Sequence, residues 1–328
     1  MIRSLYYVPG ESIRKDIPPA DFPKLLESQE GLLWVDFVSE PPETSLPILE
    51  GFKFHPLAID DALQETHIPK LDDWGNYLYI VLNYMSAREN GDLWETQIDE
   101  LDIFLGKNYI VTHHDYGVPA VDETWAACDR DPRNVQEGAD HLLYKITDNL
   151  VAGYMPAVEK IDTAIDQIED QIFDRPSPRT LERLFALKRV LVAMRRIILP
   201  QREVLNKLAR DDYEVIDPKD RIFFRDIYDH LVRLHDINES LRDLVGGALD
   251  TYLSVINNRM NEVMKTLTII TTLFMPLTFV TGFFGMNFFE PPGTLNQWTT
   301  NPVFYVVLVI TILLPIGMYI WMRRRTWV

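Results

Sequence analysis

Residues 267–284 read LTIITTLFMPLTFVTGFF, and Gly285-Met286-Asn287 follows directly. These eighteen positions carry no charge, and a second uncharged run, VFYVVLVITILLPIGMYIWM, fills the twenty positions 303–322. A helix needs about 20 apolar residues to cross a bilayer. One such run is also compatible with a buried core helix. Two at the C-terminus, joined by a short connection, predict a membrane hairpin of helix 266–284, extracytoplasmic loop 285–302 and helix 303–322.

Basic residues flank this hairpin on one side of the membrane only. The connection 285–302 contains no Lys or Arg, whereas Arg259 and Lys265 precede the first span and three arginines lie in the tail 323–328. Basic residues are retained on the cytoplasmic side. We therefore expect a multi-pass protein of the cell (inner) membrane with both termini and the soluble part in the cytoplasm. The N-terminus has no signal-peptide pattern.

The soluble part is acidic. The net charge of −17 argues against a nucleic-acid partner, because phosphate binding needs basic patches. The lone Cys128 excludes an intramolecular disulfide and fits a reducing compartment. The sequence lacks a phosphate-binding G-x-x-x-x-G-K-[ST] loop, an H-E-x-x-H motif and a nucleophile–base motif. We expect neither enzymatic activity nor a bound cofactor.

The first part, 1–138, mixes strand and helix signals. Apolar, β-rich runs at 32–37 and 77–84 are bounded by Gly, Pro or Asp. Runs 98–105 and 109–112 predict a hairpin, and 56–63 predicts a helix. The sum is a cytoplasmic α/β domain whose strand order the sequence does not reveal.

Residues 139–218 predict a helical region. Apolar side chains recur every three or four residues from Val158 to Ile172 and again from Leu181 to Ile198, which indicates two amphipathic, antiparallel helices. Pro200 is expected to interrupt the second one.

No proline lies between Lys219 and Met275. The stalk 219–265 therefore predicts a helix that continues into the first span, some 65 residues and on the order of 100 Å in length. A helix this long cannot bury itself within one domain, so we expect an oligomeric stalk. Gly246-Gly247 predicts a bend or a close helix contact.

Polar and flexible residues of this helix share one face, because nearly all of them are spaced by three or four positions. They are Asp250, Asn257, Asn261, Met264, Thr268, Thr271, Met275, Thr278 and Gly282. Threonines within a span often serve only to bond their own helix. A stripe that continues below the span into asparagines favours a water-filled axis, with the second span facing lipid. Divalent cations and the lipid bilayer are the expected partners.

The run 275–288, MPLTFVTGFFGMNF, strongly resembles the CorA family of magnesium and cobalt channels, whose signature is a Gly-Met-Asn tripeptide after the first span. The resemblance implies a cytoplasmic α/β/α domain, a long stalk helix and a homopentameric channel whose first spans line the pore. It implies that Asn287 forms a ring binding hydrated Mg²⁺ at the outer mouth, with Gly285 contributing backbone carbonyls and Met286 completing the motif. The implied pore constrictions are Asn261, Met264, Leu267, Met275 and Thr278.

The same resemblance implies regulation by intracellular Mg²⁺ bound between cytoplasmic domains. The metal ligand on the stalk corresponds to Asp226, with a partner near Glu89 or Asp92 of an adjacent subunit. The loop after the tripeptide departs from the family pattern, because Glu290 replaces an acid that other members carry elsewhere. This leaves open a zinc, cobalt or nickel transporter of the same fold. A membrane-anchored cation sensor is an alternative of another class.

One further motif, His113-His114-Asp115, follows a predicted strand. Adjacent residues of an extended chain point apart, so we expect a surface loop rather than a metal cluster.

Overall fold

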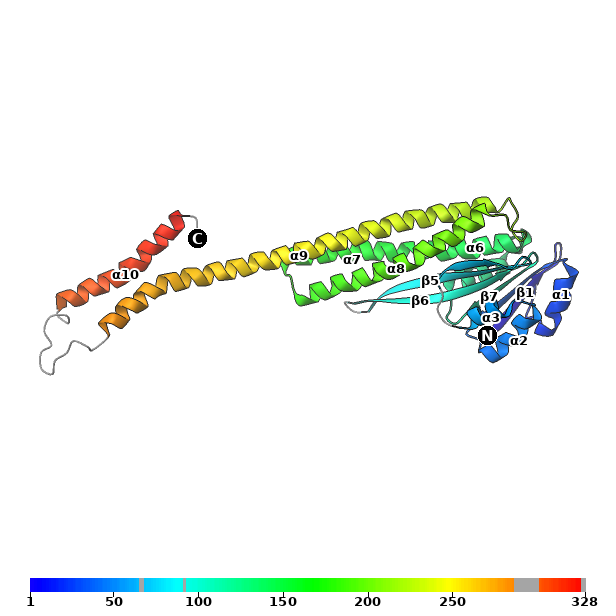
Figure 1. Ribbon diagram of the computed structural model, residues 1–328, viewed down its shortest axis with the longest axis horizontal. Helices are drawn as coiled ribbons and strands as arrows, with labels where there is room; N and C mark the ends of the chain where they lie inside the picture. The colour runs from blue at the N-terminus through cyan, green and yellow to red at the C-terminus, as the bar shows by residue number, and fades with distance from the viewer. Residues whose placement is uncertain (65–67, 91–92, 286–300, 326–328) are drawn as a thin grey trace. The chain divides into compact units, whose positions relative to one another are not determined.

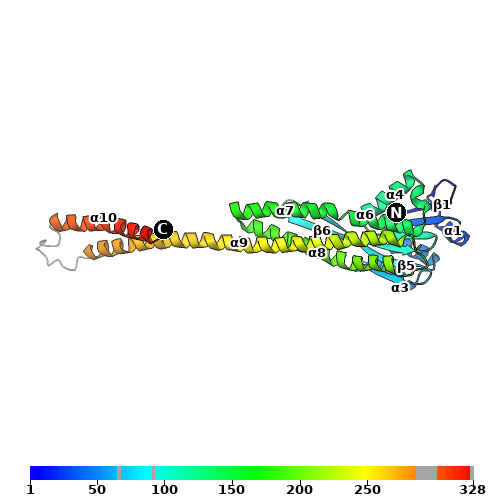
Figure 2. The same cartoon turned by 90° about the horizontal axis from the view of Figure 1, so that it is seen from above.

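The computed structural model describes residues 1–64, 68–90, 93–285 and 301–325. The chain divides into two compact units, Met1–Thr251 and Tyr252–Val328. Figures 1 and 2 show the helices and strands of each unit from two directions.

The first unit is built on a mixed sheet of seven strands in the order β2-β1-β3-β7-β6-β5-β4. The strands are β1 (Ile2–Tyr7), β2 (Arg14–Lys15), β3 (Leu32–Val38), β4 (Lys70–Asp73), β5 (Leu78–Asn90), β6 (Leu93–Leu105) and β7 (Tyr109–His114). Only β3 and β7 pair in parallel among these strands, and the predicted β6–β7 hairpin is confirmed. Parallel strands such as β3 and β7 need a long connection between them, and no local sequence pattern predicted this pairing.

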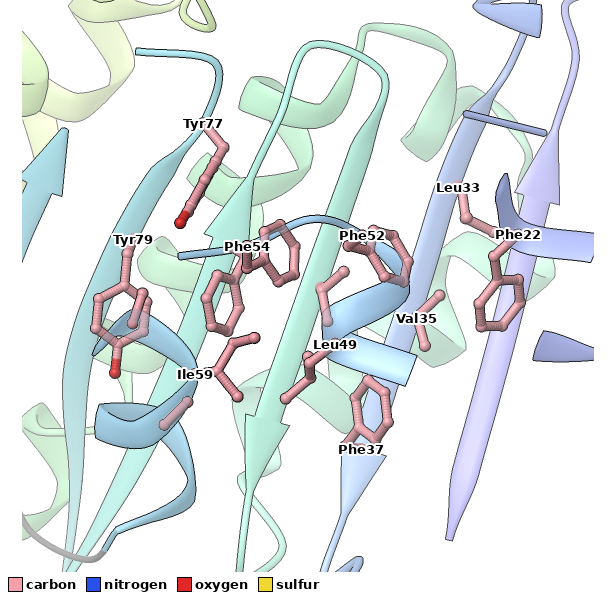
Figure 3. Close-up of a cluster of buried hydrophobic side chains, with 14 of the residues drawn as sticks. Phe22, Leu33, Val35, Phe37, Leu49, Phe52, Phe54, Ile59, Tyr77 and Tyr79 are labelled. Atoms are coloured by element: carbon pink, nitrogen blue, oxygen red, sulfur yellow. The ribbon is translucent and has the colours of Figure 1, made fainter. Parts of the chain in front are cut away.

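One face of the sheet is covered by three helices, preceded by a short 3₁₀ turn at Pro19–Asp21. They are α1 (Phe22–Ser28), α2 (Pro42–Gly51) and α3 (Pro56–Leu63), the last as predicted. Their apolar side chains pack on the strands in one buried cluster (Figure 3). At its centre the rings of Phe54 and Phe104 stack at 4.2 Å between centroids. Burying such rings is the main source of stability for this layer.

Helices also cover the opposite face. They include α4 (Pro119–Arg130), α5 (Arg133–Gln136) and α6 (Ala139–Ala152). Trp125 of α4 packs on Trp34 of β3 at 4.7 Å between ring centroids. The predicted α/β domain is confirmed as three layers, with helices on both faces of the sheet.

The two amphipathic helices are confirmed as α7 (Met155–Asp174) and α8 (Pro178–Arg210). Ser177 begins α8 in a capping box with Thr180, which supplies partners for the first backbone N–H groups. The predicted interruption at Pro200 is wrong, because α8 runs through it. The proline leaves the carbonyl of Arg196 without its helical partner, but Arg196 is exposed and water can bond this oxygen.

The predicted long helix is confirmed as α9, Arg221–Phe284, 64 residues that include Pro276. A Cβ atom at Gly246 or Gly247 would meet no atom within 4 Å, so the described residues of one chain make no close helix contact there. A bend at this pair, or a contact with another copy, stays a prediction. The last helix, α10, spans Asn301–Arg324.

Among the residues that the structure describes, two helices are long and apolar enough to cross a membrane, one within Arg221–Phe284 and one at Tyr305–Arg324. None of the apolar window of α9 is buried, and only 6% of that of α10. Phe279 and Met275 expose 73% and 72% of their surface. Apolar surface of this extent requires lipid or another protein surface to cover it.

Candidate ion pathway and cation-binding residues

The polar stripe predicted from the sequence lies on α9 and is exposed along its whole length. Its members from Asn257 onward alternate steps of four and three residues. This spacing averages 3.5 residues, the period that keeps one face of a helix directed at a common axis in a bundle. Asp250 lies two such steps before Asn257 and is also exposed.

The threonine hydroxyls of the stripe donate to the carbonyl four residues earlier in their own helix. The donor–acceptor distances are 2.7 Å for Thr268, 2.9 Å for Thr271 and 3.0 Å for Thr278. These threonines therefore bond their own helix, as threonines within membrane spans often do. It also uses the only hydroxyl proton, so each oxygen presents lone pairs outward and acts as an acceptor. Such a surface attracts cations and repels anions.

The other stripe residues add amide and thioether groups to this face. Asn261 is exposed, as are Met264 and Met275, with 56% and 72% of their surface accessible. Leu267, which neighbours the stripe, exposes 56%. No carboxylate occurs in the apolar span itself. Neutral oxygen and sulfur ligands bind a divalent cation weakly enough to release it.

The tripeptide follows the end of α9. The N–H of Gly285 donates to the carbonyl of Thr281 at 2.9 Å and so closes the last turn. Met286, Asn287 and Glu290 lie outside the described residues.

Asp226 lies on the first half of α9, within the first unit. Its side chain is 68% exposed, and its Oδ2 lies 3.9 Å from Nε2 of His230. The half-buried Asp148 of α6 is close enough to be affected by this charge. Burial is the largest cause that raises the pKa of Asp148; His230 lowers this pKa, and the charge of Asp226 raises it to a smaller extent. Burial first, and then the charges of Asp148 and Asp226, raise the pKa of Tyr144. Two carboxylates that repel each other form a natural position for a divalent cation.

Sequence reasoning missed Asp148. Tyr144 and Asp148 lie one turn apart on α6, but this helix also carries Asp140, Lys145 and other polar residues, so no sequence pattern distinguishes Asp148. The candidate partner Glu89 lies on β5 opposite Trp94, and the position of its side chain is outside the described part; Asp92 is outside it altogether. Among the described residues, no three His, Cys, Asp or Glu side chains are arranged to hold a metal ion. A cation at Asp148 and Asp226 therefore needs water or further ligands from another copy.

The expectation for His113 and His114 is wrong. Both belong to β7 and are buried, with only Asp115 in an exposed turn. Strand β7 is central in the sheet, and its polar ends are held by buried carboxylates. His114 lies 3.2 Å from Asp36, and His113 lies 3.9 Å from Asp102.

Comparison with known proteins places this chain among transporters. A family of proteins described as CorA-like Mg²⁺ transporter protein matches residues 29–324. A cobalt/magnesium transport protein CorA of Thermotoga maritima is 38% identical over 280 residues, 85% of this chain and 78% of its own length. A putative metal ion transporter, YfjQ of Bacillus subtilis, is 36% identical over 295 residues, 90% of this chain and 89% of its own.

A zinc transport protein, ZntB of Yersinia pseudotuberculosis, is 25% identical over 296 residues, 90% of this chain and 87% of its own. Among solved structures, the CorA magnesium transporter from Methanocaldococcus jannaschii superimposes with a TM-score of 0.80, covering 99% of this chain and 98% of its own, at 22% identity. This likeness shows a shared fold across both units. With the match over residues 29–324 and the 38% identical relative, it follows that the chain belongs to the family of CorA-like Mg²⁺ transporter proteins.

Proposed function

We propose that the chain is the subunit of a divalent-cation channel that mediates Mg²⁺ uptake across the cell membrane. The observation that carries this proposal is the exposed stripe of acceptor groups along the apolar part of α9. Such a face is costly against lipid but suits a water-filled axis. Mg²⁺ sheds water reluctantly, and neutral oxygens let it pass with much of its shell.

The axis requires several copies of α9. A homo-oligomer, five copies as the family resemblance implies, would direct the stripe of each copy inward and leave α10 to the lipid. The 3.5-residue spacing supports such a bundle. The basic flanks of the hairpin support an orientation with both termini in the cytoplasm.

The membrane potential would supply the driving force. A divalent cation gains roughly 4–5 kcal/mol per 100 mV, from about 2.3 per unit charge. No nucleotide or resident cofactor is then needed.

Cytosolic Mg²⁺ would close the channel by binding at Asp226. The facing carboxylate of Asp148 supports a cation position there, and Glu89 or Asp92 of an adjacent copy would complete it. Neutralising the repulsion would hold neighbouring domains together and so bias the oligomer toward one state.

Uptake of Mg²⁺ into proteoliposomes under an inside-negative potential tests the proposal. We expect flux that Asn287→Ala strongly reduces, with Asn76→Ala, at an exposed position of the first unit, as a matched control. Absence of flux from folded protein would favour the membrane-anchored sensor. Competition among Mg²⁺, Co²⁺, Ni²⁺ and Zn²⁺ decides the cargo, and the 25% identical zinc transport protein makes Zn²⁺ the alternative to include.

A further inference from the structure

A cavity of about 540 Å³ lies where β7 ends beside the longer strand β6. Strand β6 begins at Leu93, but β7 pairs only with its last part, Asp102–Leu105. The earlier part of β6 therefore has no strand beyond it on this side, and the end of α3 closes the space. The extra length of β6 thus creates the cavity.

The walls of this cavity are negatively charged. Carboxylates of Asp99, Glu100, Asp102 and Asp115 line it. Within the described part of the chain, its lining contains no Lys or Arg. Four acids of the lining therefore face two groups that can carry a positive charge, the imidazoles of His113 and His114. Unlike surface acids, Asp99 and Asp102 are buried, which reduces screening of their charge by water.

The hydroxyl of Tyr79 lies near the same group of carboxylates. It donates to Oδ1 of Asp102 at 2.6 Å. Burial raises the pKa of Tyr79, and the charges of Asp102, Glu100 and Asp61 raise it further. Tyr79 lies at the edge of the aromatic cluster in Figure 3. Several carboxylates therefore converge on one side of the sheet at this point.

His113 provides an independent sign of a ligand. Its side chain is only 5% exposed and lines the cavity. The Nδ1 atom is 3.9 Å from Oδ2 of Asp102, beyond hydrogen-bonding distance. The Nε2 atom is buried and has no hydrogen-bond partner among the described residues. A buried polar atom left in this way costs about 1–3 kcal/mol, which a bound donor would recover.

The negative lining calls for a cationic ligand. The ligand also needs hydrogen-bond donors when the proton of His113 lies on Nδ1, the nitrogen nearer Asp102, because Nε2 is then an acceptor. No three described His, Cys, Asp or Glu side chains are arranged to coordinate a metal directly. A divalent cation that keeps its water shell meets both needs, because its polarised waters donate to carboxylates and to a neutral imidazole nitrogen.

We propose that this cavity binds a hydrated divalent cation through water, with Asp102 and Glu100 as the anionic wall, Asp115 at the mouth and His113 as an acceptor. The site is formed by the sheet and is distinct from the Asp148–Asp226 position. It does not depend on transport, so it stands or fails separately from the proposed function.

Hydrogen–deuterium exchange at the imidazole C2 of histidines, measured by mass spectrometry on the full-length protein in detergent, tests the proposal. We expect millimolar Mg²⁺ to slow the exchange of His113 at least threefold, and the exchange-inert hexaamminecobalt(III) to do the same. The exposed His55 serves as an internal reference that neither ion changes. Protection by Mg²⁺ but not by hexaamminecobalt(III) would overturn binding through an intact shell.

Variants separate this site from others. Asp102→Asn should abolish the protection, and Glu100→Gln, on a half-buried residue, should reduce it if the first variant unfolds. Glu95→Gln is the matched control, because it removes one charge from β6 outside the cavity and should leave protection intact. Asp226→Asn should also leave it intact. Loss of protection in Asp226→Asn, or its persistence in both cavity variants, would overturn the proposal.

Discussion

The Nε2 atom of His114 lies 3.2 Å from Oδ1 of Asp36, and neither side chain is accessible to solvent. Burial alone would raise the pKa of Asp36, but His114, Arg3 and the Thr112 hydroxyl together hold it below its usual value. Burial would likewise lower the pKa of His114, yet Asp36 raises it above 6.5. Each group therefore favours the charged form of the other, and the pair connects β3 with β7.

This pair gives the first unit a pH-dependent stability. The raised pKa of His114 contributes stability that is complete below about pH 6.5 and is lost as the pH rises through the folded-state pKa. The lowered pKa of Asp36 contributes stability above about pH 3.8 that is lost as the pH falls further. We expect the thermal midpoint to decline from pH 6.5 to 9.

His114→Gln should flatten that decline and destabilise the protein by about 3–5 kcal/mol, as expected when one partner of a buried pair is removed. Thermal unfolding of the detergent-solubilised chain measures both effects. The control is Lys188→Gln, which removes a positive charge from an exposed position of α8. An unchanged pH profile in His114→Gln would show that other groups govern it.

A methyl group in place of a stripe hydroxyl should impair conduction. Thr271→Val keeps the shape of the side chain but removes the acceptor oxygen, and an apolar ring in a narrow pore excludes water. We expect Mg²⁺ flux to fall about tenfold. Thr266→Val is the matched control, because Thr266 makes the same bond to its own helix, at 2.9 Å to Glu262, but lies off the stripe. Equal losses in the two variants would contradict a pore-facing stripe.

Repulsion between Asp148 and Asp226 should be measurable without any transport assay. The raised pKa of Asp148 means that its ionisation opposes folding as the pH rises. Asp148→Asn should therefore increase the thermal midpoint in chelator and reduce the further increase that Mg²⁺ causes. Asp162→Asn, on an exposed position of α7, should change neither value. If the Mg²⁺ effect stays whole in Asp148→Asn, then Asp148 is not a ligand.

A buried amide connects α8 to the sheet. Gln201 is fully buried; its Oε1 accepts from the backbone N–H of Asn83 at 3.2 Å, and its Nε2 donates to the hydroxyl of Tyr154 at 3.3 Å. Gln201→Leu leaves the N–H of Asn83 without this partner and should cost about 1–3 kcal/mol. Chemical denaturation measures it, with exposed Glu203→Gln as the control. A cost below about 0.5 kcal/mol would mean that water replaces the amide.

Much of the fold could be predicted because its signals are local. Apolar periodicity identified α7, and the absence of proline identified α9. The strand order could not be predicted, since the parallel pairing of β3 and β7 joins segments far apart in sequence. The prediction that Pro200 interrupts α8 failed, because the free-energy cost of a proline within a helix depends on whether the freed carbonyl reaches water. Access to water is set by the tertiary structure.

The candidate pathway could be predicted to the same extent. The stripe follows from spacing on one helix, which sequence gives directly. Asp148 could not be paired with Asp226, because the two lie on helices brought together only by folding. His113 and His114 were misplaced for a related reason: burial of a polar strand end depends on carboxylates from β6 and β3.

The pair Gly246-Gly247 has a consequence for the local opening of α9. Each glycine lowers local helix stability by about 1 kcal/mol relative to alanine, and in the described chain a Cβ added at either position would meet no atom within 4 Å. Amide protons around this pair should therefore exchange with solvent sooner than those near the buried Leu231. The longest helix of the molecule thus carries its own point of local unwinding, just before the boundary at Thr251 where the first unit ends.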